Sequence, residues 1–173
     1  MRQAQVFVVI CAGAIAAGAL CGGAASADAT SNSMGSIPAD HMKFLGTYHC
    51  DVTLAAFAGA PATTDTGTLT ISMAPGNAFR EHVDAKDYMS DSYEGYQAKA
   101  KTWWITMNDA YGSTSYETSS DHRVYTGTGW TNGQPITLRD TRTVVHGTTL
   151  RDTTEIKQNG KWTPFATSVC TKQ

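Results

Sequence analysis

The sequence is poor in charge and lacks the motifs of nucleotide chemistry. Only 16% of its residues are charged, and its formal net charge is −2. Lys and Arg form no runs, so we expect no binding to nucleic acid or to an anionic membrane surface. The chain contains no Gly-x-Gly-x-x-Gly motif, no phosphate-binding loop and no Gly-x-Ser-x-Gly elbow. These absences argue against nucleotide-driven chemistry and against a hydrolase of the elbow type.

Metal-ligating patterns are equally scarce. The five histidines are dispersed, without a His-x-His or His-x-x-His pair, whereas zinc sites need three or four protein ligands. His82 and Asp84 share one face of a predicted strand with Arg80, but no third ligand is identifiable, and a solvated outer face accounts for them. We therefore predict neither a metal site nor a cofactor.

The first 27 residues have the layout of a secretory signal peptide. Arg2 precedes an apolar run over residues 6–20, and Ala25-Ser26-Ala27 fits a small-x-small cleavage site. The run is too short to span a bilayer comfortably, and no second hydrophobic segment follows. We expect cleavage of residues 1–27, export to the periplasm or beyond, no transmembrane segment in the mature chain, and a flexible leader over residues 28–39.

Two of the four cysteines remain after cleavage, one near each end of the predicted domain. In an oxidising compartment such a pair indicates a disulfide, here Cys50–Cys170. A link between the first and last strands favours a sheet that closes on itself over an open sandwich.

Composition and alternation predict an all-β domain over residues 40–173. Leu, Ile, Val and Phe form only about one residue in seven after position 27, but Thr, Tyr and Trp are frequent, and these favour pleated surfaces. Asp40 is expected to cap a helical turn over residues 41–45, ended by Gly46. About ten short strands with close turn signals then predict a single antiparallel β-barrel of 8–10 strands. The expected strands lie near residues 47–54, 69–73, 79–83, 91–98, 101–108, 113–119, 123–131, 135–145, 149–157 and 162–171, with an irregular stretch over 55–65.

Residue chemistry sets the register of the last three hairpins. A turn centred on Gly147 places Arg142 opposite Asp152 and avoids facing like charges. Two-residue turns at Asn132-Gly133 and Asn159-Gly160 then fix the neighbouring pairs. The resulting face should point inward, and its apolar members are Leu138, Val144, Leu150, Ile156, Phe165 and Val169.

The same inward face carries a polar cluster. Its members are Tyr125, Asp140, Arg142 and Asp152. Arg142 could anchor a ligand carboxylate or phosphate, with the two acids orienting it and Tyr125 donating a hydrogen bond. The same groups could instead form a buried ion network, or the paired acids could serve acid–base catalysis.

One conflict concerns the cysteines. The predicted register turns Cys170 outward, whereas Cys50 shares an inward face with Tyr48 and Val52. A bulge near Pro164 would resolve this conflict, because proline inside a strand usually marks an edge or a bulge.

Two further features have alternative interpretations. The four tryptophans lie on strands or at strand ends and could form a carbohydrate-stacking platform, or they could pack in the core and rim. Trp103 and Trp104 are adjacent, so one should point inward and the other outward. The apolar stretch over residues 55–62 could be a lid over a barrel mouth or a loop packed outside.

Short motifs resemble a known class of barrels. Phe44-Leu45-Gly46-Thr47-Tyr48 resembles the Leu-Gly-x-Trp opening of lipocalin-like (calycin) barrels, with Tyr48 in place of Trp. The segments Trp103-Trp104, Asn108 to Gly112 and Cys170-Thr171-Lys172 resemble a bacterial family of exported calycin-like proteins described only as a domain of unknown function. The resemblance, over residues 42–172, implies a barrel of eight to ten strands with an internal cavity, and no reaction. A related calycin group binds haem through an interior histidine, which nothing here singles out.

These observations lead to three functional hypotheses. We expect an exported barrel that binds a small, largely apolar ligand without catalysis, with Arg142 and Tyr125 fixing a polar end. An alternative is a protein-binding module, such as a periplasmic protease inhibitor that uses the leader. A third is an enzyme that uses the interior acids.

Overall fold

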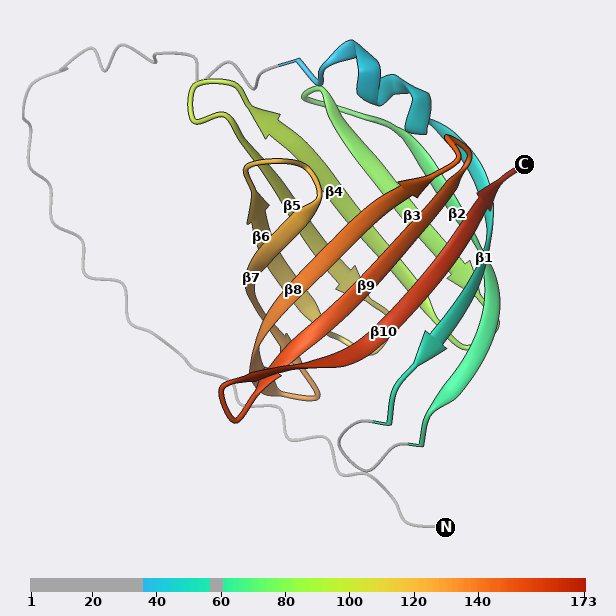
Figure 1. Ribbon diagram of the computed structural model, residues 1–173, viewed down its shortest axis with the longest axis vertical. Coiled ribbons are helices and arrows are strands. Elements are labelled where there is room, and N and C mark those ends of the chain that lie inside the picture. The colour runs from blue at the N-terminus through green and yellow to red at the C-terminus, as the bar shows by residue number, and fades with distance from the viewer. Residues whose placement is uncertain (1–35, 57–60) are drawn as a thin grey trace, which may run out of the picture. The chain divides into compact units, whose positions relative to one another are not determined.

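The computed structural model describes residues 36–56 and 61–173, and these residues form one closed barrel (Figure 1). The predicted signal peptide, most of the predicted leader and part of the stretch at 55–62 lie outside the described residues. A short 3-10 helix, η1, precedes ten strands. The elements are η1 (Ala39–Phe44), β1 (Gly46–Leu54), β2 (Thr63–Ala74), β3 (Ala78–Ala85), β4 (Met89–Gln97), β5 (Thr102–Asp109), β6 (Thr114–Ser119), β7 (Val124–Thr131), β8 (Gln134–Val145), β9 (Thr149–Gln158) and β10 (Lys161–Lys172).

Each strand pairs antiparallel with the next, and β1 pairs with β10 to close the sheet. The prediction of a single antiparallel barrel is therefore confirmed. No helix in the described ranges is long and apolar enough to cross a membrane.

Two hairpin registers are as predicted. In β8 and β9, Arg142 lies opposite Asp152 and Arg139 opposite Glu155. In β7 and β8, Tyr125 lies opposite Asp140. The turn residues Asn132 and Gly133 both have positive φ, at 50° and 70°, which matches the twist of the flanking strands in a two-residue turn.

The predicted register of the last hairpin is wrong beyond Pro164. A bulge lies between Pro164 and Ala166, so Phe165 is an extra residue in β10 and the register shifts by one. Ser168 rather than Thr167 lies opposite Asp152, and Val169 turns outward opposite Arg151. Val169 therefore does not continue the buried face formed by Leu138, Leu150 and Ile156, and Phe165 is half-buried at the bulge. The predicted bulge near Pro164 is therefore confirmed, and it turns Cys170 inward toward Cys50.

Three smaller expectations are corrected. Asp40 does not cap η1: the residue before the helix is Pro38, no side chain caps it, and Asp40 contacts the His41 ring instead. Residues 63–65, expected in an irregular stretch, begin β2. Val144 has the inward parity but lies at the barrel rim, where 39% of its surface is exposed.

The apolar core gathers at the end of the barrel beneath η1, which lies across that end (Figure 1). Phe44 of η1 is buried, and its carbonyl accepts a hydrogen bond from the Tyr48 hydroxyl at 2.8 Å. The core residues are Ile37, Phe44, Tyr48, Cys50, Leu69, Ile71, Phe79, Trp103, Tyr125, Leu150 and Cys170. Leu138 and Ile156 extend the buried apolar surface beyond this core, and the interior also contains buried serines and glutamates.

The Cys50–Cys170 disulfide links β1 to β10 inside this core. The two cysteines lie directly opposite each other and are 2% and 3% exposed. The link joins positions 120 residues apart, so it holds the two ends of the sheet together even in the unfolded chain.

Replacing both cysteines by alanine should lower the free energy of unfolding by about 4 kcal/mol, since the unfolded chain gains loop entropy. Urea denaturation followed by tryptophan fluorescence measures this loss. Wild-type protein in reductant should show the same midpoint as the double variant. A loss below about 1 kcal/mol would mean that hydrogen bonding between β1 and β10 closes the barrel without help from the disulfide.

Candidate functional site

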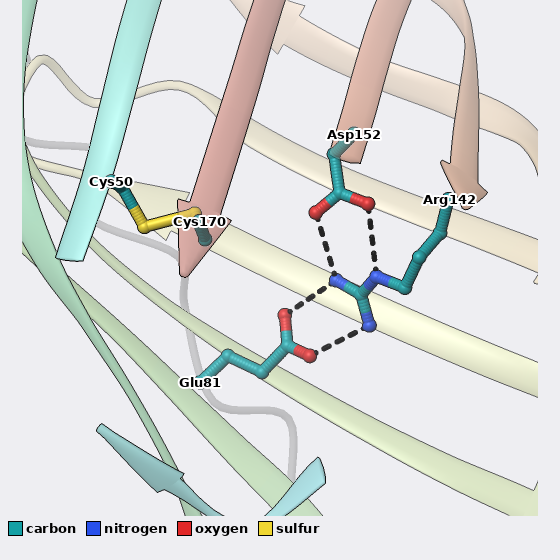
Figure 2. The surroundings of a disulfide bond; sticks show 5 residues. All are labelled: Cys50, Glu81, Arg142, Asp152 and Cys170. Atoms are coloured by element: carbon teal, nitrogen blue, oxygen red, sulfur yellow. Dashed lines mark hydrogen bonds and ion pairs between the residues drawn. A yellow bond between two sulfur atoms is a disulfide. The ribbon is translucent and has the colours of Figure 1, made fainter. Parts of the chain in front are cut away.

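The centre of the interior site is the guanidinium of Arg142, which projects from β8 into the barrel. It lies between Glu81 of β3 and Asp152 of β9 (Figure 2). Nη1 and Nη2 donate to the two oxygens of Glu81 at 2.8 and 3.0 Å. Nε and Nη2 donate to the two oxygens of Asp152 at 3.1 and 3.4 Å. Nη1 also donates to Glu94 at 3.3 Å.

Arg142 therefore uses all five of its N–H groups on three carboxylates. Its side chain is 15% exposed, and those of Glu81 and Glu94 are 6% and 1% exposed. Burial alone would lower the pKa of Arg142, but the surrounding carboxylates outweigh burial and hold that pKa well above its usual value. The guanidinium is a permanent positive charge with no donor left over for a ligand anion.

Glu94 of β4 connects this ion cluster to an aromatic group. Its Oε1 accepts a short hydrogen bond from the Tyr125 hydroxyl and lies 2.6 Å from His122 Nε2. Burial disfavours the charged form, yet His122, Arg142 and Tyr125 together hold the pKa of Glu94 below its usual value. Glu94 is therefore ionised, and burial beside its charge raises the pKa of Tyr125.

Aromatic rings on η1 and beneath it pack around His122 in tilted and edge-on arrangements. The His122 ring lies 4.0 Å from that of Trp103 and 4.3 Å from that of His41, centroid to centroid. His122 is 8% exposed and lies between β6 and β7 with a φ of 60°. This backbone conformation is uncommon for a residue with a side chain, and it directs the ring into the barrel rather than out of the turn.

A cavity of about 280 Å³ opens at this end of the barrel. Of the four residues predicted as a binding cluster, only Arg142 lines it. The cavity wall combines rings, charged groups and one aliphatic side chain: His41, Phe44, Asp121, His122, Arg123, Arg142, Thr143 and Val144.

The predicted cluster divides into two groups. Arg142 and Asp152 are directly bonded, and Tyr125 reaches them through Glu94. Asp140 belongs elsewhere: it interacts with Thr154 and with Glu117 of β6. The sequence analysis missed Glu81, Glu94 and Glu117.

Glu117 and Asp140 form a buried carboxyl pair. Burial and the neighbouring Asp140 raise the pKa of Glu117 from 4.5 to about 9, and burial raises the pKa of Asp140 as well. Glu117 is 2% exposed and accepts one further bond, from Ser115 at 3.1 Å. Two facing carboxyl groups hold one proton between them at neutral pH.

His82 and Arg80, which were predicted to lie on a solvated outer face of a strand, take part in surface contacts with one carboxylate. Both side chains contact Asp91 of the neighbouring strand, at 3.1 and 2.8 Å, and all three are partly exposed. Among the described residues, no three His, Cys, Asp or Glu side chains are arranged to hold a metal ion.

Replacing Arg142 by methionine should cost about 3–5 kcal/mol of stability at neutral pH, because the buried Glu81 and Glu94 and the partly exposed Asp152 lose their shared cation. Their pKa values then rise in the folded state, so the fold binds protons that the unfolded chain releases, and stability falls as pH increases. Thermal melts should show the variant far closer to wild type at pH 5 than at pH 8. Arg139→Met is the matched control, since Arg139 pairs with Glu155 near the surface and should cost about 1 kcal/mol or less. Equal losses at both pH values would contradict this charge balance.

Glu117→Gln should remove pH sensitivity from the barrel. In the wild type the folded state keeps a proton that the unfolded chain releases near its usual pKa, so stability should fall between about pH 5 and pH 9, by up to about 1.4 kcal/mol per pH unit. Glutamine supplies the same donor to Asp140 without titrating. The variant should therefore melt at a higher temperature than the wild type at pH 8.5. The exposed Asp51→Asn serves as control and should leave the wild-type profile unchanged.

Comparison with known proteins supports the fold. The chain matches no protein-family model and no curated protein sequence. Among solved structures, the crystal structure of Rv2717c from M. tuberculosis is similar, with a TM-score of 0.57 and 11% sequence identity. The likeness covers 80% of this chain and 99% of that chain. At this identity the likeness shows a shared barrel fold alone, and the resemblance to lipocalin-like barrels stays a prediction.

Proposed function

We propose that the protein binds a small, largely apolar molecule in the cavity beneath η1, and that it does so without catalysis. The observation that carries the proposal is the cavity itself, whose roughly 280 Å³ lie just below the range of about 300–1,000 Å³ typical of small-ligand pockets, which favours a small ligand. Phe44 and Val144 offer apolar surface in the wall, and His122, Thr143 and Arg142 supply polar groups.

The ion cluster would position the polar end of the ligand indirectly. Arg142 has no spare N–H, so a ligand anion would have to displace a carboxylate. Tyr125 instead hydrogen-bonds to Glu94, which contacts His122 in the cavity wall. Asp152 accepts hydrogen bonds from Arg142 and so holds its guanidinium in place. A ligand group that exchanges hydrogen bonds with His122 or Thr143 fits this arrangement better than a second strong anion. Asp140 lies opposite Tyr125 in the strand ladder and interacts with Glu117 rather than with Arg142 directly.

Export belongs to the same proposal. The first 27 residues have signal-peptide chemistry, and the buried Cys50–Cys170 disulfide is typical of an oxidising compartment. An extracytoplasmic carrier or sensor of a small molecule would be consistent with both features.

The two other hypotheses gain less support. The paired acids Glu117 and Asp140 have the perturbed pKa values of catalytic groups, but neither lines the cavity. The protease-inhibitor hypothesis depends on residues 28–39, most of which lie outside the described residues.

Val144→Trp should block the cavity mouth and weaken binding of N-phenyl-1-naphthylamine, an uncharged probe with an apolar body and one N–H donor, by about tenfold or more, since a filled pocket loses its buried contact area. Fluorescence titration measures the dissociation constant. Val124→Trp is a matched control, because Val124 is equally exposed, at 40% against 39%, and does not line the cavity. Equal affinity of both variants and wild type would place the probe elsewhere and contradict the proposal. Native mass spectrometry of protein purified from its host then identifies the natural ligand.

A further inference from the structure

The outer face of β5, β6 and β7 carries no charged side chain along its outward positions. Threonine occupies most of these positions, and the others include Trp104, Tyr116 and Trp130. Tyr93 of β4 adjoins them on the same side of the sheet. We call Tyr93, Trp104, Tyr116 and Trp130 the aromatic face. Soluble monomers rarely leave several large rings together on one surface without a binding role.

The strand register sets the spacing of these rings. Tyr93 lies opposite Thr106, and Thr106 lies opposite Tyr116, so the two tyrosines flank one threonine. Two strand spacings separate them, about 10 Å. Trp130 lies opposite Thr114, two residues along β6 from Tyr116. The rings therefore form a staggered row across four strands, with hydroxyl groups between them.

The rings are accessible, and one is held in place by a glycine. Tyr116 and Trp130 are each 55% exposed, and Tyr93 is 39% exposed. The Trp104 ring lies directly over Gly95 of β4: a Cβ at position 95 would come within 2.4 Å of the indole Cζ2. Because Gly95 lacks a side chain, the indole can lie down on the sheet. Its position is therefore fixed before any ligand arrives, which lowers the entropy cost of binding.

This combination of groups selects for a class of ligand. Aromatic rings pack against the apolar C–H faces of pyranose sugars, and threonine hydroxyls both donate and accept hydrogen bonds, as sugar hydroxyls require. Nucleic acid would need a basic surface. An apolar protein partner would desolvate a row of threonine hydroxyls at a cost. A neutral, hydroxyl-rich, extended chain matches the rings and the uncharged outward positions of β5, β6 and β7. Charge enters at the β4 edge, where Arg80 lies opposite Tyr93 and pairs with Asp91.

We propose that the aromatic face binds an uncharged, extended β-1,4-linked glycan that runs across β4 to β7. A β-1,4-linked chain is a flat ribbon that presents ring faces at regular intervals, as the staggered row of rings does. The site lies on the outside of the barrel and is independent of the cavity beneath η1.

Isothermal titration calorimetry of the full chain with cellohexaose and with chitohexaose tests the proposal. The wild type should bind at least one of them, and Tyr116→Ala combined with Trp130→Ala should weaken that binding by about tenfold or more, since two stacked rings are lost. Trp162→Ala is the matched control: Trp162 packs beneath Arg139 on another part of the barrel and its loss should leave affinity unchanged. Thr106→Val, which removes one hydroxyl between the tyrosines at constant volume, should weaken binding by a smaller factor. The N-phenyl-1-naphthylamine titration should be unaffected by all of these variants.

Two results would overturn the proposal. The first is an absence of binding to either hexasaccharide at millimolar concentration by folded wild-type protein. The second is a dimer in sedimentation equilibrium that Tyr116→Ala dissociates, because a second copy of the chain would then cover the aromatic face.

Discussion

One guanidinium is the shared partner of three carboxyl groups in the barrel interior. Arg142 reaches across from β8 and bonds carboxylates supplied by β3, β4 and β9. Carboxylates this deeply buried would be strongly destabilising if unpaired, and their shared partner converts them into a connected network. Through Glu94 the network also contacts Tyr125 and His122. The two cavity-lining residues Arg142 and His122 are therefore held by the same carboxylate.

The interior contains two clusters of buried acidic groups, and their charge is stabilised in different ways. Near η1, Glu94 is ionised and is stabilised by Arg142 and by the hydrogen bond from Tyr125. At Glu117 and Asp140, one of the two negative charges is removed instead, by a proton that the pair retains. A barrel with few large aliphatic residues can be filled in this way, because polar side chains that bond one another occupy the volume that leucine and isoleucine would otherwise take.

Much of this architecture follows from local sequence chemistry, and the rest depends on closure of the sheet. The Arg142–Asp152 pair was predictable because like charges rule out the neighbouring registers of one hairpin. Glu81 and Glu94 were not, since they lie 61 and 48 residues from Arg142 and meet it only across the closed barrel. The available signal was weak: Glu81 lies two residues from both Phe79 and Val83, so it shares their inward side of the strand. His122 carried no sequence signal, because it lies in a turn between β6 and β7, where it combines a positive φ with a buried ring.

The bulge at Phe165 gives β10 two halves of opposite orientation. Before it, Trp162 packs outside against Arg139; after it, Cys170 faces the interior beside Cys50. A one-residue slip in this strand would exchange its inner and outer sides and carry the Cys170 thiol away from its partner. In the folded barrel the disulfide therefore holds the register of β10, because a strand shifted by one residue would place the two sulfur atoms on opposite sides of the sheet.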